Sequence, residues 1–166
     1  MKNIVLIGFM GAGKSTIARE LQKSMGMTVL EMDAMIAQRE GMSIPEIFRT
    51  KGEPYFRDAE TALLVELQER DGVVVSCGGG TPMRQCNVTE MKKIGPVVLL
   101  WAEPETVLER VRYDHGRPLL EGHKDVAYIA GLLQQRRDKY EAACDFVVRT
   151  DGKSAEAIAR EILERI

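Results

Sequence analysis

The chain has 166 residues, of which 45% are hydrophobic and 29% are charged, with 23 Lys and Arg against 25 Asp and Glu. This length is typical of one domain, and the composition excludes an intrinsically disordered or a collagen-like chain. The net charge of −2 argues against a general nucleic-acid-binding protein, so any anionic ligand has to be captured locally.

The three cysteines, Cys77, Cys86 and Cys144, predict neither a disulfide framework nor a zinc site, because their number is odd and none lies in a CxxC pair. Cys77 is expected to be a buried filler residue. The longest apolar stretches are far shorter than the roughly 20 residues that span a bilayer, and the sequence shows no basic and apolar leader. We therefore expect a cytoplasmic protein that binds neither membranes nor nucleic acid.

Five short apolar runs predict five strands, and the segments between them carry the signals of helices. The runs are Ile4–Ile7, Thr28–Met32, Val73–Cys77, Val97–Ala102 and Phe146–Arg149. Strands that are apolar throughout and alternate with helices are typical of a parallel sheet covered on both faces. The predicted class is therefore α/β, with three layers.

The first predicted strand leads into a phosphate-loop pattern, G-x-x-x-x-G-K-[ST], at residues 8 to 15, and a helical segment follows. Its glycines allow backbone N–H groups to close around phosphate oxygens at a helix N-terminus. Lys14 supplies a positive charge, and the hydroxyl of Ser15 is expected to coordinate Mg²⁺. The alternative, a glycine-rich turn with an incidental lysine, requires both the pattern and its context to be accidental.

The phosphate loop predicts a bound nucleoside triphosphate but not its fate, because GTPases, ATPases, regulatory domains and metabolite kinases all carry this loop. The sequence has no Asn-Lys-x-Asp run of the kind found in guanine-specific GTPases. Five strands also leave little room for a separate mechanical domain. A small phosphotransferase is favoured, and a catalytically idle nucleotide-binding module is the alternative.

Asp33 follows the second predicted strand, so we expect it at the carboxyl edge of the sheet, where open α/β sheets bind ligands. A carboxylate in that place can accept a hydroxyl proton. The alternative is that Asp33 caps a helix that begins near Met35.

Capping signals predict further helices along the chain. Ser43 with Glu46 forms a capping box, and Gly52 fits the end of that helix. Asn87 with Glu90 resembles another helix start. Near the C-terminus, a helix with one apolar face is expected behind an N-cap at residue 154.

Two other features each allow two interpretations from the residues alone, and a third feature predicts a loop. Arg57 and Glu60 lie one helical turn apart, which fits an exposed ion pair as well as a functional pair. Gly78-Gly79-Gly80 either brings bare backbone close to a ligand or makes a tight strand exit. The polar segment from Tyr113 to Asp125 is predicted to be a loop between two helices.

Taken together, the motifs resemble those of the shikimate kinase family. In chain order they are GFMGAGKS, MDAMI, GMSIPEIF, GEPYFRDAE, CGGGTP, RPLL and RRDKY, over about residues 3 to 160. The resemblance implies transfer of the γ-phosphate of ATP to the 3-hydroxyl of shikimate, which gives shikimate 3-phosphate and ADP in the pathway to aromatic amino acids. It also implies a fold like that of nucleoside monophosphate kinases, with strand order 2-3-1-4-5. A single kinase domain over residues 1–166 would carry a lid at about residues 112–125.

On the acceptor side, the resemblance implies that Asp33 holds the acceptor hydroxyls and acts as the base. Arg57 and Arg136 would grip the substrate carboxylate, for which a planar guanidinium is suited. Glu60 would hold Arg57, and the glycines Gly78, Gly79 and Gly80 would contact the ring.

The choice of Arg136 depends on spacing, because the second carboxylate-binding arginine of the family precedes a tyrosine by four residues. This favours Arg136 over Arg137. The alternative is a solvated arginine on a charged helix face, and the family often has proline where this chain has Asp138.

On the nucleotide side, the resemblance implies ATP contacts from Gly11, Ala12, Gly13, Lys14, Ser15 and Thr16. Arg110 would line the adenine side, and Lys153 lies where the family closes over the base. Arg117, in the lid, would reach the phosphates and act with Lys14 and Asp33 in catalysis; the alternative is a chance arginine on a surface loop. His115 and His123 are expected to be solvated lid residues.

Magnesium is the implied cofactor. The family commonly has Asp-x-Asp after the second strand, with the first Asp supporting the water shell of Mg²⁺, whereas this chain has Glu31-Met32-Asp33. We assign Glu31 to the outer metal shell. The expected partners are ATP and shikimate, and the expected state is a monomer.

Overall fold

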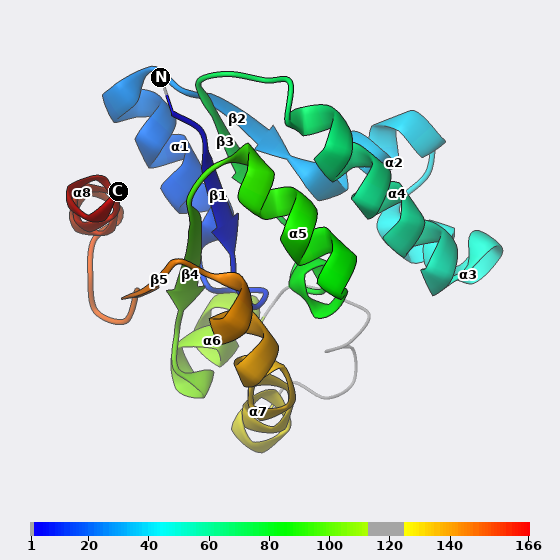
Figure 1. Ribbon diagram of the computed structural model, residues 1–166. Helices are drawn as coiled ribbons and strands as arrows, with labels where there is room; N and C mark the ends of the chain where they lie inside the picture. Colours follow the sequence, from blue (N-terminus) through cyan, green and yellow to red (C-terminus); the bar gives the residue numbers. More distant parts are fainter. Residues whose placement is uncertain (1, 113–124) are drawn as a thin grey trace.

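The computed structural model describes residues 2–112 and 125–166 (Figure 1). The expectations for the lid, and with them those for Arg117, His115 and His123, lie outside the described residues. None of the described helices is both long and apolar enough to cross a bilayer.

Five parallel strands form one sheet in the order β2-β3-β1-β4-β5, which confirms the predicted strand order. They are β1 (Ile4–Ile7), β2 (Thr28–Glu31), β3 (Val73–Ser76), β4 (Val97–Trp101) and β5 (Phe146–Arg149). Every predicted strand is present, and β2, β3 and β4 end one residue earlier than expected. Every residue of β1, β3 and β4 is buried, whereas the edge strands β2 and β5 are partly exposed.

Two apolar layers lie on opposite faces of the sheet, because successive side chains of a strand point to opposite sides. Ile4 and Leu6 pack in one layer, and Val5 and Ile7 pack in the other. The first layer is covered by α1 (Lys14–Met25) and α8 (Ala155–Arg165), which lie on the same side of the sheet (Figure 1). This arrangement confirms the three-layer α/β/α architecture.

The second layer is covered by the remaining helices. They are α2 (Met32–Glu40), α3 (Ile44–Lys51), α4 (Glu53–Leu67), α5 (Gln85–Ile94), α6 (Pro104–Val111) and α7 (Val126–Ala143), with a short 3₁₀ helix, η1, at Thr81–Met83. Strands β2 and β3 are parallel neighbours, so the segments that follow their carboxyl ends lie close together. Asp33, which follows β2, lies against Gly78, which follows β3.

Three of the predicted helix boundaries are confirmed by cap geometry. The Ser43 hydroxyl accepts a hydrogen bond from the N–H of Glu46 at 3.3 Å, and the Ser154 hydroxyl caps α8 in the same way. Gly52 ends α3 as expected, and it is also the residue directly before α4, with φ 88° and ψ 158°. This positive φ favours glycine, so a single residue joins the two helices without a loop.

One other cap expectation is wrong. Helix α5 begins at Gln85, and Asn87 is a buried residue inside it whose amide donates to the carbonyl of Thr81 at 3.0 Å. The amide is used in a tertiary contact and therefore does not cap the helix. Helix α2 begins at Met32, so Asp33 lies in its first turn, and the alternative that Asp33 caps a helix beginning near Met35 is excluded.

Candidate active site

Two adjoining cavities open beside the carboxyl ends of β1, β2 and β3. The phosphate-loop cavity, of about 490 Å³, is lined by Met10, Gly11, Gly13, Lys14, Ser15, Thr16, Glu31, Asp33, Ala34, Ser76, Cys77, Gly78, Gly79 and Arg110. The arginine cavity, of about 320 Å³, is lined by Met10, Asp33, Ile44, Phe48, Glu53, Phe56, Arg57, Glu60, Gly78, Gly79, Gly80 and Arg136. Met10, Asp33, Gly78 and Gly79 belong to both, so these residues form the wall between the two cavities.

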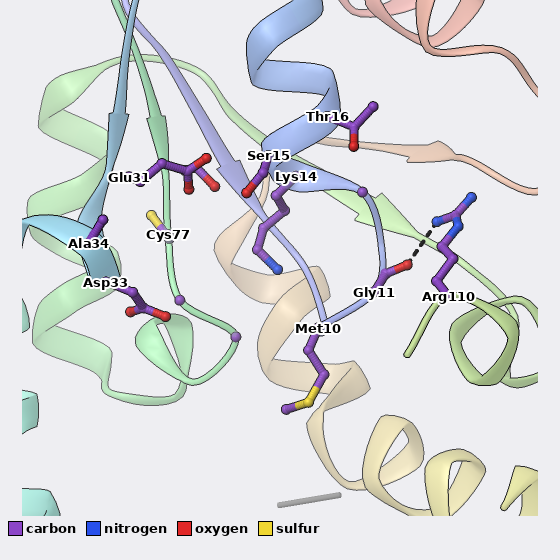
Figure 2. Close-up of a pocket in the computed structure, with 14 residues that line it drawn as sticks. Met10, Gly11, Lys14, Ser15, Thr16, Glu31, Asp33, Ala34, Cys77 and Arg110 are labelled. Carbon is purple, nitrogen blue, oxygen red and sulfur yellow. Dashed lines mark hydrogen bonds between the residues drawn. The ribbon is translucent and has the colours of Figure 1, made fainter. Parts of the chain in front are cut away.

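The phosphate loop joins β1 to α1. Gly13 has φ 99°, a conformation that other residues resist, and α1 begins at the next residue. The first turn of the helix therefore directs N–H groups and the positive end of its dipole into the phosphate-loop cavity (Figure 2). The Lys14 ammonium group donates to the carbonyls of Gly8 and Phe9 at 2.7 and 3.0 Å. Its charge is thus held inside the loop, where an anion would be enclosed.

The structure brings most of the predicted nucleotide-binding residues to this cavity, but not all of them. Gly11, Gly13, Lys14, Ser15, Thr16 and Arg110 line it. Ala12 is buried behind the loop, and its N–H donates to the carbonyl of Phe9 at 3.1 Å. Lys153 lies after β5, outside the lining, and pairs with Glu161 at 2.9 Å.

Arg110 ties α6 to the phosphate loop. One guanidinium nitrogen donates to the carbonyl of Gly11 at 2.8 Å, shown as a dashed line in Figure 2, and to the hydroxyl of Thr150 at 3.2 Å. The side chain therefore stands at the end of the cavity away from Asp33 (Figure 2).

Few side chains in this cavity can bind Mg²⁺, and this cation needs few protein ligands because it keeps most of its water molecules. The Ser15 hydroxyl and the Glu31 carboxylate line the same cavity and point toward each other (Figure 2). Among the described residues no group of three or more His, Cys, Asp or Glu side chains is arranged to hold a metal ion. A hydroxyl with one nearby carboxylate fits Mg²⁺, which keeps several waters and binds substrate phosphates in place of a full set of protein ligands.

Arg57 and Glu60 are not the exposed pair that their spacing allowed. The Glu60 carboxylate is fully buried, and Arg57 Nη1 donates to it at 2.7 Å. Glu60 also accepts from the hydroxyl of Thr81 at 2.5 Å. Burial raises the pKa of Glu60 above its ordinary value, and the Arg57 charge opposes this shift. Burial lowers the pKa of Arg57, but its acidic neighbours outweigh burial and raise it.

The glycine triplet packs against these charged groups. A methyl group built on Gly78 would lie 2.7 Å from Asp33 Oδ1, and one built on Gly80 would lie 2.8 Å from Arg57 Nη1. A side chain at either place would displace the Asp33 carboxylate or the Arg57 guanidinium from its position. The segment is therefore both the exit from β3 and a bare wall of the arginine cavity.

Arg136, and not Arg137, reaches the arginine cavity. Arg136 lies over the ring of Phe9 with its guanidinium carbon 5.6 Å from the ring centre, whereas Arg137 lies over Trp101 and pairs with Glu141 at 2.9 Å. Helix α7 continues unbroken through Asp138, although the family often has proline there. The arginine four residues before Tyr140 is therefore the one that lines the cavity.

Cys77 takes no part in this chemistry as a nucleophile. Its side chain is 2% exposed. Burial, with smaller effects from the carboxylates of Glu60 and Asp33, raises the pKa of the thiol far above its ordinary value. The expectation of a buried filler residue is confirmed.

The sequence is similar to those of one known protein family. The family model described as "Shikimate kinase" matches residues 10–166. The chain belongs to the shikimate kinase family. Curated shikimate kinases of Moorella thermoacetica and Thermus thermophilus are each 42% identical to it, over 99% and 98% of this chain and 94% and 89% of theirs.

Solved structures of the family have the same fold. Shikimate kinase from Acinetobacter baumannii in complex with shikimate has a TM-score of 0.92 at 35% identity, covering 99% of this chain and 92% of that one. A gluconokinase from Sinorhizobium meliloti, 20% identical with a TM-score of 0.62 over 98% of this chain and 90% of that one, shares the fold alone. The family and the kinase activity implied by the motifs are confirmed.

Several residues of the kinase site were missed by the sequence analysis. Thr81 and Asn87 support Glu60, since Thr81 donates to Glu60 and the Asn87 amide holds the Thr81 carbonyl. Asn87 could have been noticed in the sequence, because it is a polar residue on the otherwise apolar face of α5, four residues before Met91. No comparable signal marked Met10, which lines both cavities.

Proposed function

We propose that the two cavities hold ATP and shikimate side by side and that the γ-phosphate passes between them to the 3-hydroxyl of the acid. The observation that carries the proposal is the shared wall, in which Asp33 faces both cavities. In phosphoryl transfer the protein mainly positions the reactants and stabilises charge, so a carboxylate at the junction is suitably placed to accept the proton of the acceptor hydroxyl.

The phosphates of ATP lie against the N–H groups of the loop and of the first turn of α1, and Lys14 balances the charge on the β- and γ-phosphates. Mg²⁺, when bound, neutralises further phosphate charge. The Ser15 hydroxyl would hold it directly, and Glu31 would act through a water molecule. Arg117 completes the charge clamp by analogy with the family, and this role remains a prediction from the sequence.

The acceptor lies in the arginine cavity with its carboxylate between Arg57 and Arg136. These guanidinium groups come from two different helices, α4 and α7, and both line the cavity, so the acid would be held by two separate segments of the chain. Glu60 holds Arg57 in place, and the bare backbone of the glycine triplet lets the ring approach closely. A single kinase domain over residues 1–166, a monomeric state and a cytoplasmic location complete the proposal.

The test is an acceptor panel with ATP and Mg²⁺, in which ADP release is coupled to a spectroscopic signal. Shikimate should support turnover, whereas gluconate, nucleoside monophosphates and buffer alone should not. Turnover with gluconate or a nucleotide in place of shikimate would identify a different small-metabolite kinase. ATP binding without transfer to any acceptor would identify the catalytically idle module.

Replacing Lys14 by methionine should lower kcat by about 100- to 1000-fold, because a charged donor to the transferred phosphate is lost while the length of the side chain is kept. Lys23→Met is the matched control, since Lys23 is an exposed lysine in the last turn of the same helix. Circular dichroism checks that both variants fold. Equal turnover of the Lys14 variant and the unchanged chain would contradict the role of the phosphate loop.

A further inference from the structure

Arg136 differs from Arg57 in the groups that surround it. Arg57 contacts two carboxylates, at 2.7 Å from Glu60 and 3.1 Å from Glu53. Within residues 2–112 and 125–166, no carboxylate lies within 4.0 Å of the Arg136 guanidinium, whose contacts are the Phe9 ring and the hydroxyl of Tyr140. The positive charge of Arg136 is therefore not balanced by an ion pair in the described part of the chain.

Tyr140 lies one helical turn after Arg136 on α7, and its side chain is fully buried in the core. Its hydroxyl donates to the carbonyl of Gly79 at 2.7 Å and accepts from Arg136 Nη1 at 3.4 Å. Burial raises the pKa of this hydroxyl, so it stays protonated and neutral at ordinary pH. One neutral group thus connects the guanidinium to the backbone of the glycine triplet.

Gly79 is itself packed against the phosphate loop. A methyl group built on it would lie 3.6 Å from the Met10 nitrogen and 3.7 Å from the Gly8 oxygen. The backbone that Tyr140 holds is therefore part of the wall between the two cavities. A hydroxyl bonded to that wall and to Arg136 fixes the guanidinium relative to the place where the phosphate is transferred.

We propose that Tyr140 is a positioning residue, whose buried hydroxyl orients Arg136 toward the acceptor carboxylate without neutralising its charge. A carboxylate in the same place would hold the guanidinium more strongly but would compete with the acidic substrate for it. The Tyr140 phenol orients the Arg136 guanidinium, and the charge of the guanidinium stays available to pair with the ligand. The inference rests on the proposed function, in which Arg136 binds the carboxylate of shikimate.

The test is Tyr140→Phe, which removes one oxygen atom and keeps the ring that packs in the core. We expect kcat/KM for shikimate to fall about ten-fold through a higher KM, because a hydrogen bond to a charged group is lost. The KM for ATP should stay close to that of the unchanged chain, and the thermal unfolding temperature should fall modestly, because the Gly79 carbonyl loses its donor. Tyr55→Phe is the matched control, since the Tyr55 hydroxyl bonds to Glu40 at 2.9 Å on the exposed surface.

A double-mutant cycle with Arg136→Ala separates positioning from a general structural role. If Tyr140 acts through Arg136, adding Tyr140→Phe to Arg136→Ala should leave kcat/KM for shikimate unchanged. An equal fall in both backgrounds, or a fall for ATP as large as that for shikimate, would overturn the inference, as would no change in Tyr140→Phe alone. Lack of shikimate turnover by the unchanged chain would instead overturn the proposed function, and the inference with it.

Discussion

Asp33→Asn should lower kcat by about 10²- to 10⁴-fold, the range that general base catalysis contributes. Asparagine has nearly the same shape but cannot accept the proton of the acceptor hydroxyl. The fold should be kept, because Asp33 lies in the first turn of α2 and does not cap it. Initial rates of ADP release at saturating ATP and shikimate measure the effect, and calorimetry with ATP alone should show normal nucleotide binding.

Asp58→Asn is the control for this loss of charge. Asp58 is an exposed aspartate on α4, with 76% of its side chain accessible, and it pairs with Arg84 at 2.8 Å, outside both cavities of the site. Its replacement should leave turnover unchanged. A kcat for Asp33→Asn equal to that of the control would exclude Asp33 as the base.

Arg57→Ala and Arg136→Ala should each weaken shikimate capture by about 2–5 kcal/mol, because each removes one partner of a desolvated charge pair. At about 1.4 kcal/mol for each factor of ten, KM for shikimate should rise roughly 30- to 4000-fold. The KM for ATP should change much less. Arg137→Ala is the matched control, since Arg137 is the sequence neighbour of Arg136 and lies over Trp101, outside the arginine cavity.

The two variants should differ in stability. Arg57→Ala leaves the fully buried Glu60 carboxylate without its guanidinium partner, which costs about 3–5 kcal/mol in buried ion pairs. Arg136→Ala leaves no such carboxylate among the described residues, so its loss of stability should be smaller. Denaturant unfolding measures the difference, and Glu60→Gln should recover part of the stability lost in Arg57→Ala. For substrate binding, a KM for shikimate that is normal in both Arg57→Ala and Arg136→Ala would show that neither arginine binds the acid.

The strands were predictable, because each strand is a short apolar run, and the phosphate loop marked the passage from the first strand to the first helix. The position of Asp33 followed from the same logic, since residues after a parallel strand gather at one edge of the sheet. These features depend on local sequence. The family motifs then supplied the strand order and selected Arg136.

The contacts that hold the site residues in place were not predictable from local sequence, because they join segments that are distant in the chain. The spacing of Arg57 and Glu60 fits a surface pair equally well, and the burial of Glu60 depends on Thr81, which lies 21 residues further along the chain. The helix signal at Asn87 was misleading for the same reason, since its amide bonds to a neighbouring turn. Tertiary contacts outweighed local propensity at each of these positions.

The direct junction of α3 and α4 at Gly52 limits how this kinase can vary. Phe48 lies before the junction and Arg57 after it, and the ring centre of Phe48 is 5.9 Å from the guanidinium carbon. With no loop to absorb a change, inserting or deleting one residue of α3 between Phe48 and Gly52 would turn Phe48 by about 100° around the axis of α3 relative to the junction. The Phe48 ring would then no longer pack against the Arg57 guanidinium. Under the proposed role of Arg57, a change in the number of residues between Phe48 and Arg57 should therefore disturb acid binding more than a substitution there.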